Sequence, residues 1–359
     1  MKNKFKRLRF GFFVLLLFVC GCATVPKTVE ERQKAIFYPP EPDEPRLQFL
    51  VSFSSSDDLE GPPSGFRKFI VGEEKQTKPI VKPYGVAVYN DKIYICDTVH
   101  NSIDILDLEK RKFEFFRPKE EAHLIDPINL SFDANGDMYV ADSRRGQVAI
   151  FDKSGDYLGA IGKKSEFKPT DVLIRDDKIY ICDLKTQSVK VYALKDKQYL
   201  FSIPKEGAKE EAKLFSPTNI AIDEGKNLYV SDTGGFKVQK YNENGEFLMS
   251  MGSHGDSPGQ FARPKGIAVD KEGRVYVVDA AFENVQIFDK EGKLLLFFAE
   301  PGGSAASLVL PAGIAIDYSL KDSFSPFIDP AFEAEYLVLV TSQYGDRKLS
   351  IFAFGHKKQ

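Results

Sequence analysis

The sequence has no tryptophan, only four cysteines and four histidines, and few of the short motifs by which enzymes are recognised. No two histidines are spaced i, i+4 and HExxH does not occur, so a zinc site of the common helical kind is not expected. CxxCH is absent, which excludes a c-type haem attached to this chain. The GxGxxG and Walker patterns of nucleotide-binding loops are absent as well. These absences favour a binding protein over an enzyme.

Residues 1–21 form a pattern typical of a bacterial export signal. Five basic residues precede an apolar run at 12–19, which is too short to span a bilayer and has the length of a secretory signal. The run ends in VCGC (19–22), which resembles a lipobox with Cys22 as the lipidated first residue of the mature chain. An ordinary signal peptide or a short anchor is the alternative. Because Ala23 follows the cysteine, the resemblance implies sorting to the outer membrane of the cell envelope.

The charge balance argues against nucleic acid as a partner. The whole chain has 49 basic and 52 acidic residues, and residues 1–21 hold five of the basic ones and none of the acidic ones. The mature chain would therefore carry 44 against 52, a net charge of −8. Nucleic acid and anionic lipid surfaces both reward clustered positive charge. We expect the N-terminal lipid to be the membrane contact of this protein.

Residues 22–45 are predicted to be a tether between that lipid and the folded domain. Its YPPEPDEP segment (38–45) is rich in proline and acidic residues, so it should be extended and semi-rigid. The folded domain is then expected to span residues 46–356.

The segment 263–298 predicts four consecutive strands. Its runs GIAVD, RVYVVD, VQIFD and KLLLFF have the length and the β-branched or aromatic content of strands, and KEG turns join the first to the second and the third to the fourth. Four antiparallel strands in sequence form a meander, which cannot bury both of its faces alone. This sheet therefore needs neighbours.

The neighbours are repeats in the same chain. The proline that opens the unit recurs at 42- to 48-residue steps, as Pro83, Pro127, Pro169, Pro217, Pro264 and Pro311. The aspartate that ends the second strand recurs as Asp97, Asp142, Asp183, Asp232 and Asp279. A period of 40 to 50 residues with four strands per repeat predicts an all-β fold, a six-bladed β-propeller with four-stranded antiparallel blades.

The motif P-x-G-I-A-V-D, followed by Y-V-x-D and V-x-x-F-D, resembles the NHL-repeat family of propellers. The resemblance covers residues 46–355 and is closest in the fourth and fifth repeats. The sixth repeat departs from it, because Thr341-Ser342 stand where the aspartate is expected. The family includes recognition modules, sensors and a few enzymes, so the resemblance implies a fold and leaves the chemistry open.

The N-terminus is predicted to close the ring. The sixth repeat has only three strand-like runs before the chain stops, whereas 47–54 (LQFLVSFS) precedes the first full repeat. We expect 47–54 to supply the missing outer strand, which also removes exposed sheet edges. The same repeat carries an insertion at 318–336 with three phenylalanines, expected to pack as a plug on the underside or, alternatively, to dock a partner.

The repeated aspartates and the two remaining cysteines are predicted to be structural. A carboxylate that ends a strand before a tight loop usually accepts hydrogen bonds from the backbone N–H groups of that loop. Cys96 and Cys182 hold equivalent places in non-adjacent repeats, too far apart for a disulfide, and should be small buried hydrophobes.

Three polar residues are predicted to face one mouth of the central channel. Where three repeats have the glycine of P-x-G, the second, third and fourth have Asn129, Asp171 and Asn219. Oxygen ligands of this kind suit Ca²⁺, and lactonases with six-bladed propellers resemble this arrangement. The alternative is that these short side chains cap loop backbone or hold water.

The loops after the repeated aspartates differ from blade to blade, as expected of a surface that recognises a protein or an extended polymer. Arginines and aromatic residues contribute most often to interface energy, so the expected anchors are Arg144, Arg145, Phe236, Lys237 and Phe282. Two functions follow. The first is a lipid-anchored scaffold that binds a protein partner in an envelope assembly without a cofactor. The second is a calcium-dependent, lactonase-like or lyase-like enzyme.

Overall fold

The computed structural model describes residues 35–61 and 76–358. The predicted signal peptide, the lipidated Cys22 and the first part of the predicted tether therefore lie outside the described residues. Within the described ranges, no helix is long and apolar enough to cross a membrane.

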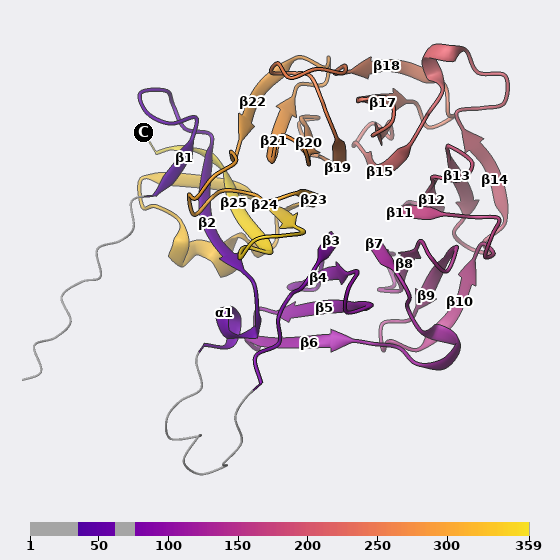
Figure 1. Cartoon of the computed structure of the whole chain (residues 1–359), viewed down its shortest axis with the longest axis horizontal. Coiled ribbons are helices and arrows are strands. Elements are labelled where there is room, and N and C mark those ends of the chain that lie inside the picture. The colour runs from indigo at the N-terminus through magenta and orange to yellow at the C-terminus, as the bar shows by residue number, and fades with distance from the viewer. Residues whose placement is uncertain (1–34, 62–75, 359) are drawn as a thin grey trace, which may run out of the picture. The chain divides into compact units, whose positions relative to one another are not determined.

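The described residues form a six-bladed β-propeller, as predicted (Figure 1). The blades are antiparallel sheets in which the strands follow one another from the channel outward. The first two blades contain β3 (Pro83–Tyr89), β4 (Lys92–Asp97), β5 (Ser102–Asp107) and β6 (Lys112–Phe116), then β7 (Pro127–Phe132), β8 (Met138–Asp142), β9 (Gln147–Phe151) and β10 (Tyr157–Ile161). The next two contain β11 (Pro169–Arg175), β12 (Lys178–Asp183), β13 (Ser188–Ala193) and β14 (Tyr199–Ile203), then β15 (Pro217–Ile222), β16 (Leu228–Asp232), β17 (Lys237–Tyr241) and β18 (Phe247–Met251). The fifth contains β19 (Pro264–Val269), β20 (Val275–Asp279), β21 (Asn284–Phe288) and β22 (Leu294–Phe298).

The sixth blade confirms that the N-terminal strand closes the ring. It combines β23 (Pro311–Asp317), β24 (Phe332–Ser342) and β25 (Leu349–Lys357) with β2 (Leu47–Phe53), which runs antiparallel to β25. A fifth strand, β1 (Ile36–Tyr38), pairs with β2 and lies within the range predicted as tether. The folded unit thus begins about ten residues earlier than the repeat pattern indicated.

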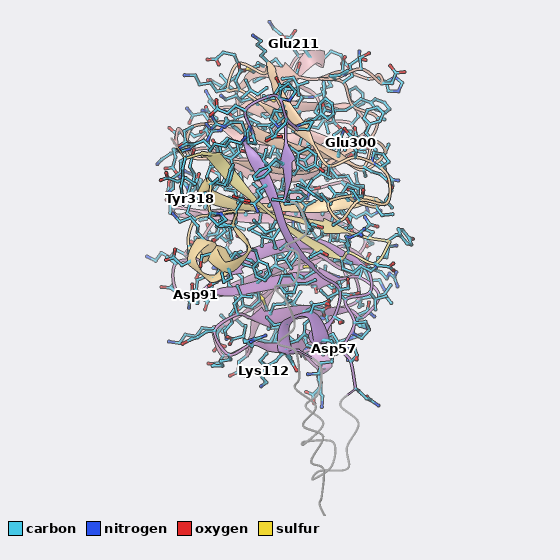
Figure 2. All side chains as sticks on the ribbon, turned by 90° about the vertical axis from the view of Figure 1, so that its left-hand side faces the viewer. Asp57, Asp91, Lys112, Glu211, Glu300 and Tyr318 are labelled. Carbon is cyan, nitrogen blue, oxygen red and sulfur yellow. The ribbon has the colours of Figure 1, made fainter. Side chains whose placement is uncertain are left out.

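The six inner strands contact one another in chain order and surround the channel (Figure 1). The side view distinguishes two faces of the ring. Asp91 and Tyr318, from loops between first and second strands, lie on one face, whereas Glu300, from a connection between blades, lies on the other (Figure 2). We call the latter the loop face, because it also carries the loops between second and third strands.

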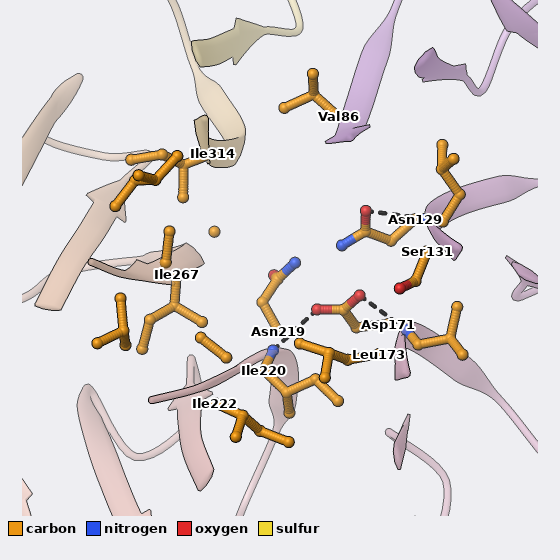
Figure 3. Close-up of a pocket in the computed structure, with 17 residues that line it drawn as sticks. Val86, Asn129, Ser131, Asp171, Leu173, Asn219, Ile220, Ile222, Ile267 and Ile314 are labelled. Atoms are coloured by element: carbon orange, nitrogen blue, oxygen red, sulfur yellow. Dashed lines mark hydrogen bonds between the residues drawn. The ribbon is translucent and has the colours of Figure 1, made fainter. Parts of the chain in front are cut away.

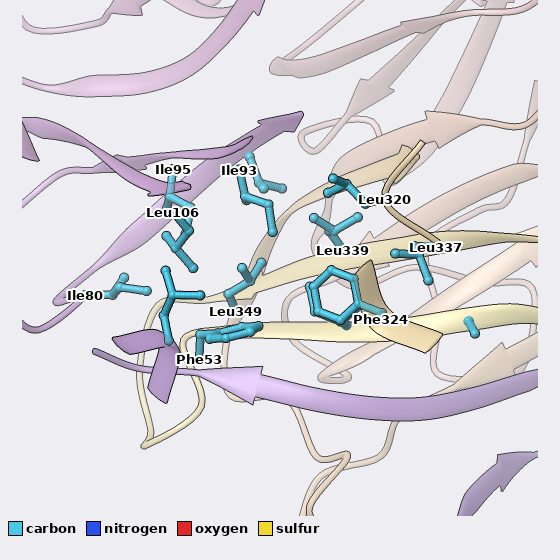
Figure 4. Packing of buried hydrophobic residues seen from close by; sticks show 14 of the residues in the cluster. Phe53, Ile80, Ile93, Ile95, Leu106, Leu320, Phe324, Leu337, Leu339 and Leu349 are labelled. Carbon is cyan, nitrogen blue, oxygen red and sulfur yellow. The ribbon is translucent and has the colours of Figure 1, made fainter. Parts of the chain in front are cut away.

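Hydrophobic side chains fill the space between neighbouring blades. In the cluster between the first and sixth blades, Phe53 of β2 packs with Ile93 of the first blade and with Leu349 of β25 (Figure 4). Burial of one such side chain stabilises the fold by roughly 1.5–3 kcal/mol. The insertion at 318–336 forms the 3₁₀ helix η3 (Leu320–Phe327), whose Leu320 and Phe324 join this cluster. It is packed, as the sequence indicated.

The repeated aspartates hold the connections of the blades in place. Asp279 is fully buried and accepts hydrogen bonds from the backbone N–H groups of Ala262 (2.8 Å) and Arg263 in the incoming connection and of Ala281 (2.9 Å) in the outgoing loop. The other four make the same kind of contact, which confirms their structural role. Cys96 and Cys182 are buried free thiols, also as predicted. The three short helices α1 (Ser56–Glu60), η1 (Glu120–Ala122) and η2 (Glu210–Ala212) lie in connections.

Candidate functional site

The channel contains a cavity of about 220 Å³ in which a few polar side chains lie among aliphatic ones (Figure 3). Asn129, Asp171 and Asn219 are each the third residue of an inner strand, in β7, β11 and β15, so equivalent positions in three adjacent blades bring them to one side. Val86 and Ile314 lie on the opposite side. The structure thus brings together the three residues singled out from the sequence.

Glycine occupies the equivalent position in the other three blades because the backbones approach too closely for a side chain. A Cβ on Gly266 would lie 2.5 Å from the carbonyl oxygen of Ala312, and one on Gly313 would lie 2.2 Å from that of Tyr84. Both distances are far inside van der Waals contact, so a side chain there would displace backbone. The polar half of the channel is therefore the half in which this position can carry a side chain.

Both side-chain oxygens of Asp171 already accept hydrogen bonds from the backbone. One accepts a hydrogen bond from the N–H of Val172 (2.8 Å) and the other from the N–H of Ile220 (2.9 Å) in the next blade. Burial raises the pKa of Asp171 to about 7, although these N–H groups and the nearby amides of Asn219 and Asn129 favour the ionised form. Asp171 is thus a bridge between blades that titrates near neutral pH.

This set of donors is a poor match for calcium. Asn129 accepts a hydrogen bond from the N–H of Leu130 (3.0 Å), whereas the side-chain oxygen of Asn219 is buried without a partner. Ca²⁺ takes six to eight oxygens, usually with several carboxylates. The channel offers one carboxylate and two amides, so three or more further oxygens would have to come from water or a ligand.

A second polar pair in the channel region was not found by sequence reasoning. The Nζ of Lys265 donates a hydrogen bond to the hydroxyl of Tyr84 (3.1 Å) and lies 4.7 Å from the centre of its ring. Burial, followed by the charges of Arg263 and Lys82, lowers the pKa of Lys265 to about 8. Both residues occupy the variable x of P-x-G, a position that the repeat motif does not mark.

The predicted anchors on the loop face differ in how far their side chains are already engaged in contacts within the fold. Arg144 is exposed, but Arg145 donates to the side chain of Gln147 (3.0 Å) and to the backbone carbonyls of Glu121 and His123, so it holds a connection in place. Phe236 and Lys237 are half-buried, and the ring of Phe236 lies against His254, with ring centres 4.3 Å apart.

Phe282 lines a pocket of about 370 Å³ on the loop face of the fifth blade. We call this the rim pocket, and its lining residues are Asp256, Ser257, Pro258, Phe282, Asn284, Gln286, Phe297, Glu300 and Pro301. The side-chain oxygen of Asn284 is buried there without a hydrogen-bond partner. The pocket thus combines an apolar lining, two acidic residues and an unpaired acceptor.

One pattern in this region escaped sequence reasoning. Residues 255–259 have the sequence GDSPG, which matches the G-x-S-x-G motif of a hydrolase nucleophile elbow. An elbow needs a sharp turn from a strand into a helix, whereas 255–259 lies in a connection of bends and turns between β18 and β19. The N–H of Ser257 donates to the side chain of Gln260 (3.1 Å). Among the described residues, no base forms a hydrogen bond with the Ser257 hydroxyl, so the match lacks its structural context.

Comparisons with known proteins agree with the fold. Residues 261–288 match the model of the NHL repeat family, on the motif that carried the resemblance. No curated protein sequence matches the chain. A Bacteroides thetaiotaomicron protein of unknown function has a similar structure, with 15% identity over 85% of this chain and 75% of that chain and a TM-score of 0.59.

Two enzymes are also structurally similar to the chain. A gluconolactonase from Xanthomonas campestris is 16% identical over 91% of this chain and 99% of that chain, with a TM-score of 0.54. Virginiamycin B lyase from Staphylococcus aureus is 12% identical over 76% and 95%, with a TM-score of 0.52. At such identities the similarity shows the propeller fold alone and not its chemistry.

Proposed function

We propose that this propeller is a protein-binding module of the cell envelope and that it binds its partner through the loop face. The observation that carries the proposal is the rim pocket, a largely apolar recess on a face whose loops differ from blade to blade. A recess of this kind suits an anchoring side chain of a partner, because buried anchors contribute most of the energy of an interface.

The rest of the loop face supports this role. Val99 in the first blade, Phe215 at the start of the fourth and Tyr344 in the sixth are large apolar residues that are between 46% and 54% exposed. Single exposed apolar residues are ordinary on protein surfaces. Here, however, they stand on the same face as the rim pocket and the exposed Arg144, which is the mixture typical of interface anchors.

The chemistry of the rim pocket indicates the kind of partner segment. Asp256 and Glu300 line the pocket together with Phe282 and Phe297, and Asn284 offers an unpaired acceptor. An apolar side chain flanked by lysine or arginine would fill the recess and complement its charge. The lipid on Cys22 would hold the propeller at the membrane, in reach of envelope partners.

The alternative is a propeller enzyme with its site in the channel. The cavity beside Asn129, Asp171 and Asn219 favours it, as does the fold shared with a lactonase and a lyase. The commitment of both Asp171 oxygens to backbone N–H groups argues against it.

Capture with matched variants tests the two functions. Tagged full-length protein is cross-linked in native membranes, and the partner retained by the wild type is identified. Phe282→Ala should weaken its retention by at least about fivefold, because truncation of an anchor costs more than about 1 kcal/mol. Phe327→Ala is the control, since Phe327 is 47% exposed but belongs to η3 on the opposite face.

Replacement of Asn129, Asp171 and Asn219 by glycine should leave capture unchanged. Equal retention by the Phe282 and Phe327 variants would contradict the binding proposal. Calcium-dependent hydrolysis of a lactone by the wild type, lost in the triple glycine variant, would establish the enzyme instead.

A further inference from the structure

The first blade gathers two carboxylates and an imidazole at a place that the proposed function does not use. Asp97 ends β4, His100 lies in the following loop and Asp104 belongs to β5. In the register of this hairpin Asp97 pairs with Ser102 and Ile95 with Asp104, so both carboxylates project from the same face of the sheet. Oxygen and nitrogen atoms of the three side chains lie within 4.8 Å of one another.

The equivalent position in other blades never carries a negative charge. In the third blade it is Lys190, whose Nζ forms an ion pair with the repeated aspartate Asp183 at 3.0 Å. In the fourth and fifth blades it is Gln239 and Gln286, which donate to backbone carbonyls. In the second blade it is an alanine. The first blade thus places a carboxylate where the third has the balancing ammonium.

Asp104 forms no ion pair with any of the described residues. Asp104 is fully buried; one oxygen accepts a hydrogen bond from the hydroxyl of Ser102 (2.9 Å), and the other has no partner. His100 Nδ1 is likewise buried without a hydrogen bond and faces an oxygen of Asp97 at 3.6 Å. A buried polar atom without a partner calls for one, which water or a bound ion can supply.

The nearest cations are occupied elsewhere. The guanidinium of Arg117 lies 4.2 Å from the centre of the Phe115 ring, and Lys348 from the sixth blade donates to the carbonyl of Gln343 (3.1 Å). Neither forms an ion pair with Asp97 or Asp104 in the described part of the chain. A bound cation would supply the positive charge that no ion pair gives this group.

We propose that Asp97, His100 and Asp104 bind one divalent transition-metal ion, with Zn²⁺ as the best fit. One imidazole and two carboxylates suit Zn²⁺ better than Ca²⁺ or Mg²⁺, which prefer oxygen donors alone. Ligand bonds of about 2.0–2.2 Å place tetrahedral donor atoms about 3.3 Å apart, so the side chains must close in. His100 can do this, because it comes from a loop and is 22% exposed.

In the first blade the ion would have the role that the Lys190 ammonium has in the third blade. It would stabilise the hairpin of β4 and β5. Both oxygens of Asp97 already accept hydrogen bonds from backbone N–H groups, which fix the carboxylate, so the ion would bind through a remaining lone pair of one of them. This site is separate from the rim pocket and does not depend on the proposed partner.

Zinc binding by the full-length chain tests the proposal. After removal of metal with a chelator, wild-type protein titrated with ZnCl₂ should bind one ion with micromolar or better affinity, and MgCl₂ or CaCl₂ should not compete. His100→Gln and Asp104→Lys should each weaken binding by at least about tenfold, since even residues behind the ligands commonly matter that much. Asp104→Lys copies the pair of the third blade and should retain the fold.

A second histidine cluster supplies the control. His356 lies 3.3 Å from Glu335 and 3.9 Å from Glu333 at the surface, so it could bind zinc adventitiously. His356→Gln should leave the binding of one ion unchanged. Zinc should raise the melting temperature of the wild type but not that of Asp104→Lys or of Asp104→Gln, which serves if the lysine variant misfolds. Failure of the wild type to bind zinc, or binding that is lost only with His356, would overturn the proposal.

Discussion

The carboxyl group of Asp171 should make the stability of the propeller fall as the pH rises. Burial raises its pKa from 3.8 to about 7, so the folded protein disfavours the ionised form. Below about pH 4 the group is protonated in both states and adds no penalty. Between pH 4 and 7 the unfolded chain releases the proton and the folded chain keeps it, so the free energy of unfolding falls by about 1.4 kcal/mol per pH unit. The full penalty above pH 7 is about 4 kcal/mol.

Asp171→Asn isolates this effect. Asparagine cannot ionise, and it retains one of the two oxygens that accept from Val172 and Ile220, so its constant cost is about 1 kcal/mol for one lost hydrogen bond. The variant should be about as stable as the wild type at pH 4.5, where the penalty of the wild type has already reached about 1 kcal/mol. It should be more stable at pH 8, with a change of about 3 kcal/mol in the difference between the two proteins.

Urea unfolding of both proteins at pH 4.5 and 8, without added metal, measures this change. Asp177→Asn is the control, because the Asp177 side chain is 85% exposed and its replacement should have the same effect at both pH values. A difference between wild type and Asp171→Asn that does not vary with pH would refute the argument. It would mean that Asp171 is ionised in the folded state and that the channel supplies charge compensation beyond the contacts described.

Two further predictions concern the N-terminus. Mass spectrometry of membrane-extracted protein should find a chain that starts at Cys22 with a diacylglyceryl group, and Cys22→Ala should release or misprocess it; an intact N-terminus in the membrane would contradict this. Deletion of 22–54 should lower the melting temperature sharply, because it removes β2 from the sixth blade, whereas deletion of 23–34 should not. Equal melting temperatures would show that closure adds no stability.

The architecture was predictable because it is repeated. Six prolines and five aspartates at a steady period identify the same four-stranded unit several times, so an irregularity in one copy does not hide the pattern. The same repetition revealed the missing strand of the last blade, which β2 supplies. Strand β1 has three residues and no counterpart in the repeats, so no period could reveal it.

The candidate sites were less predictable, because they depend on contacts that the repeat does not encode. The side-chain oxygens of Asp171 looked available as ligands, yet backbone N–H groups of two blades occupy both. Arg145 looked free, yet it reaches carbonyls more than twenty residues away. The cluster of Asp97, His100 and Asp104 is not marked by a familiar metal-binding spacing, since it depends on hairpin register and on a loop side chain.

The repeats also provide a way to separate structural from functional residues within one chain. A residue type that recurs with the same contacts, like the buried aspartate that ends the second strand in five blades, is explained by the fold. A residue that departs from its counterparts needs a separate cause, especially where the departure is costly. Burial of Asp104 lowers the stability of the fold, since it places a second buried carboxylate where the third blade has Lys190. Phe282 in the rim pocket has Thr186 as its counterpart in the third blade, where the hydroxyl donates to Asp183 at 2.7 Å. The function of this propeller should depend on residues that differ from their counterparts in this way, rather than on the residues of the shared motif.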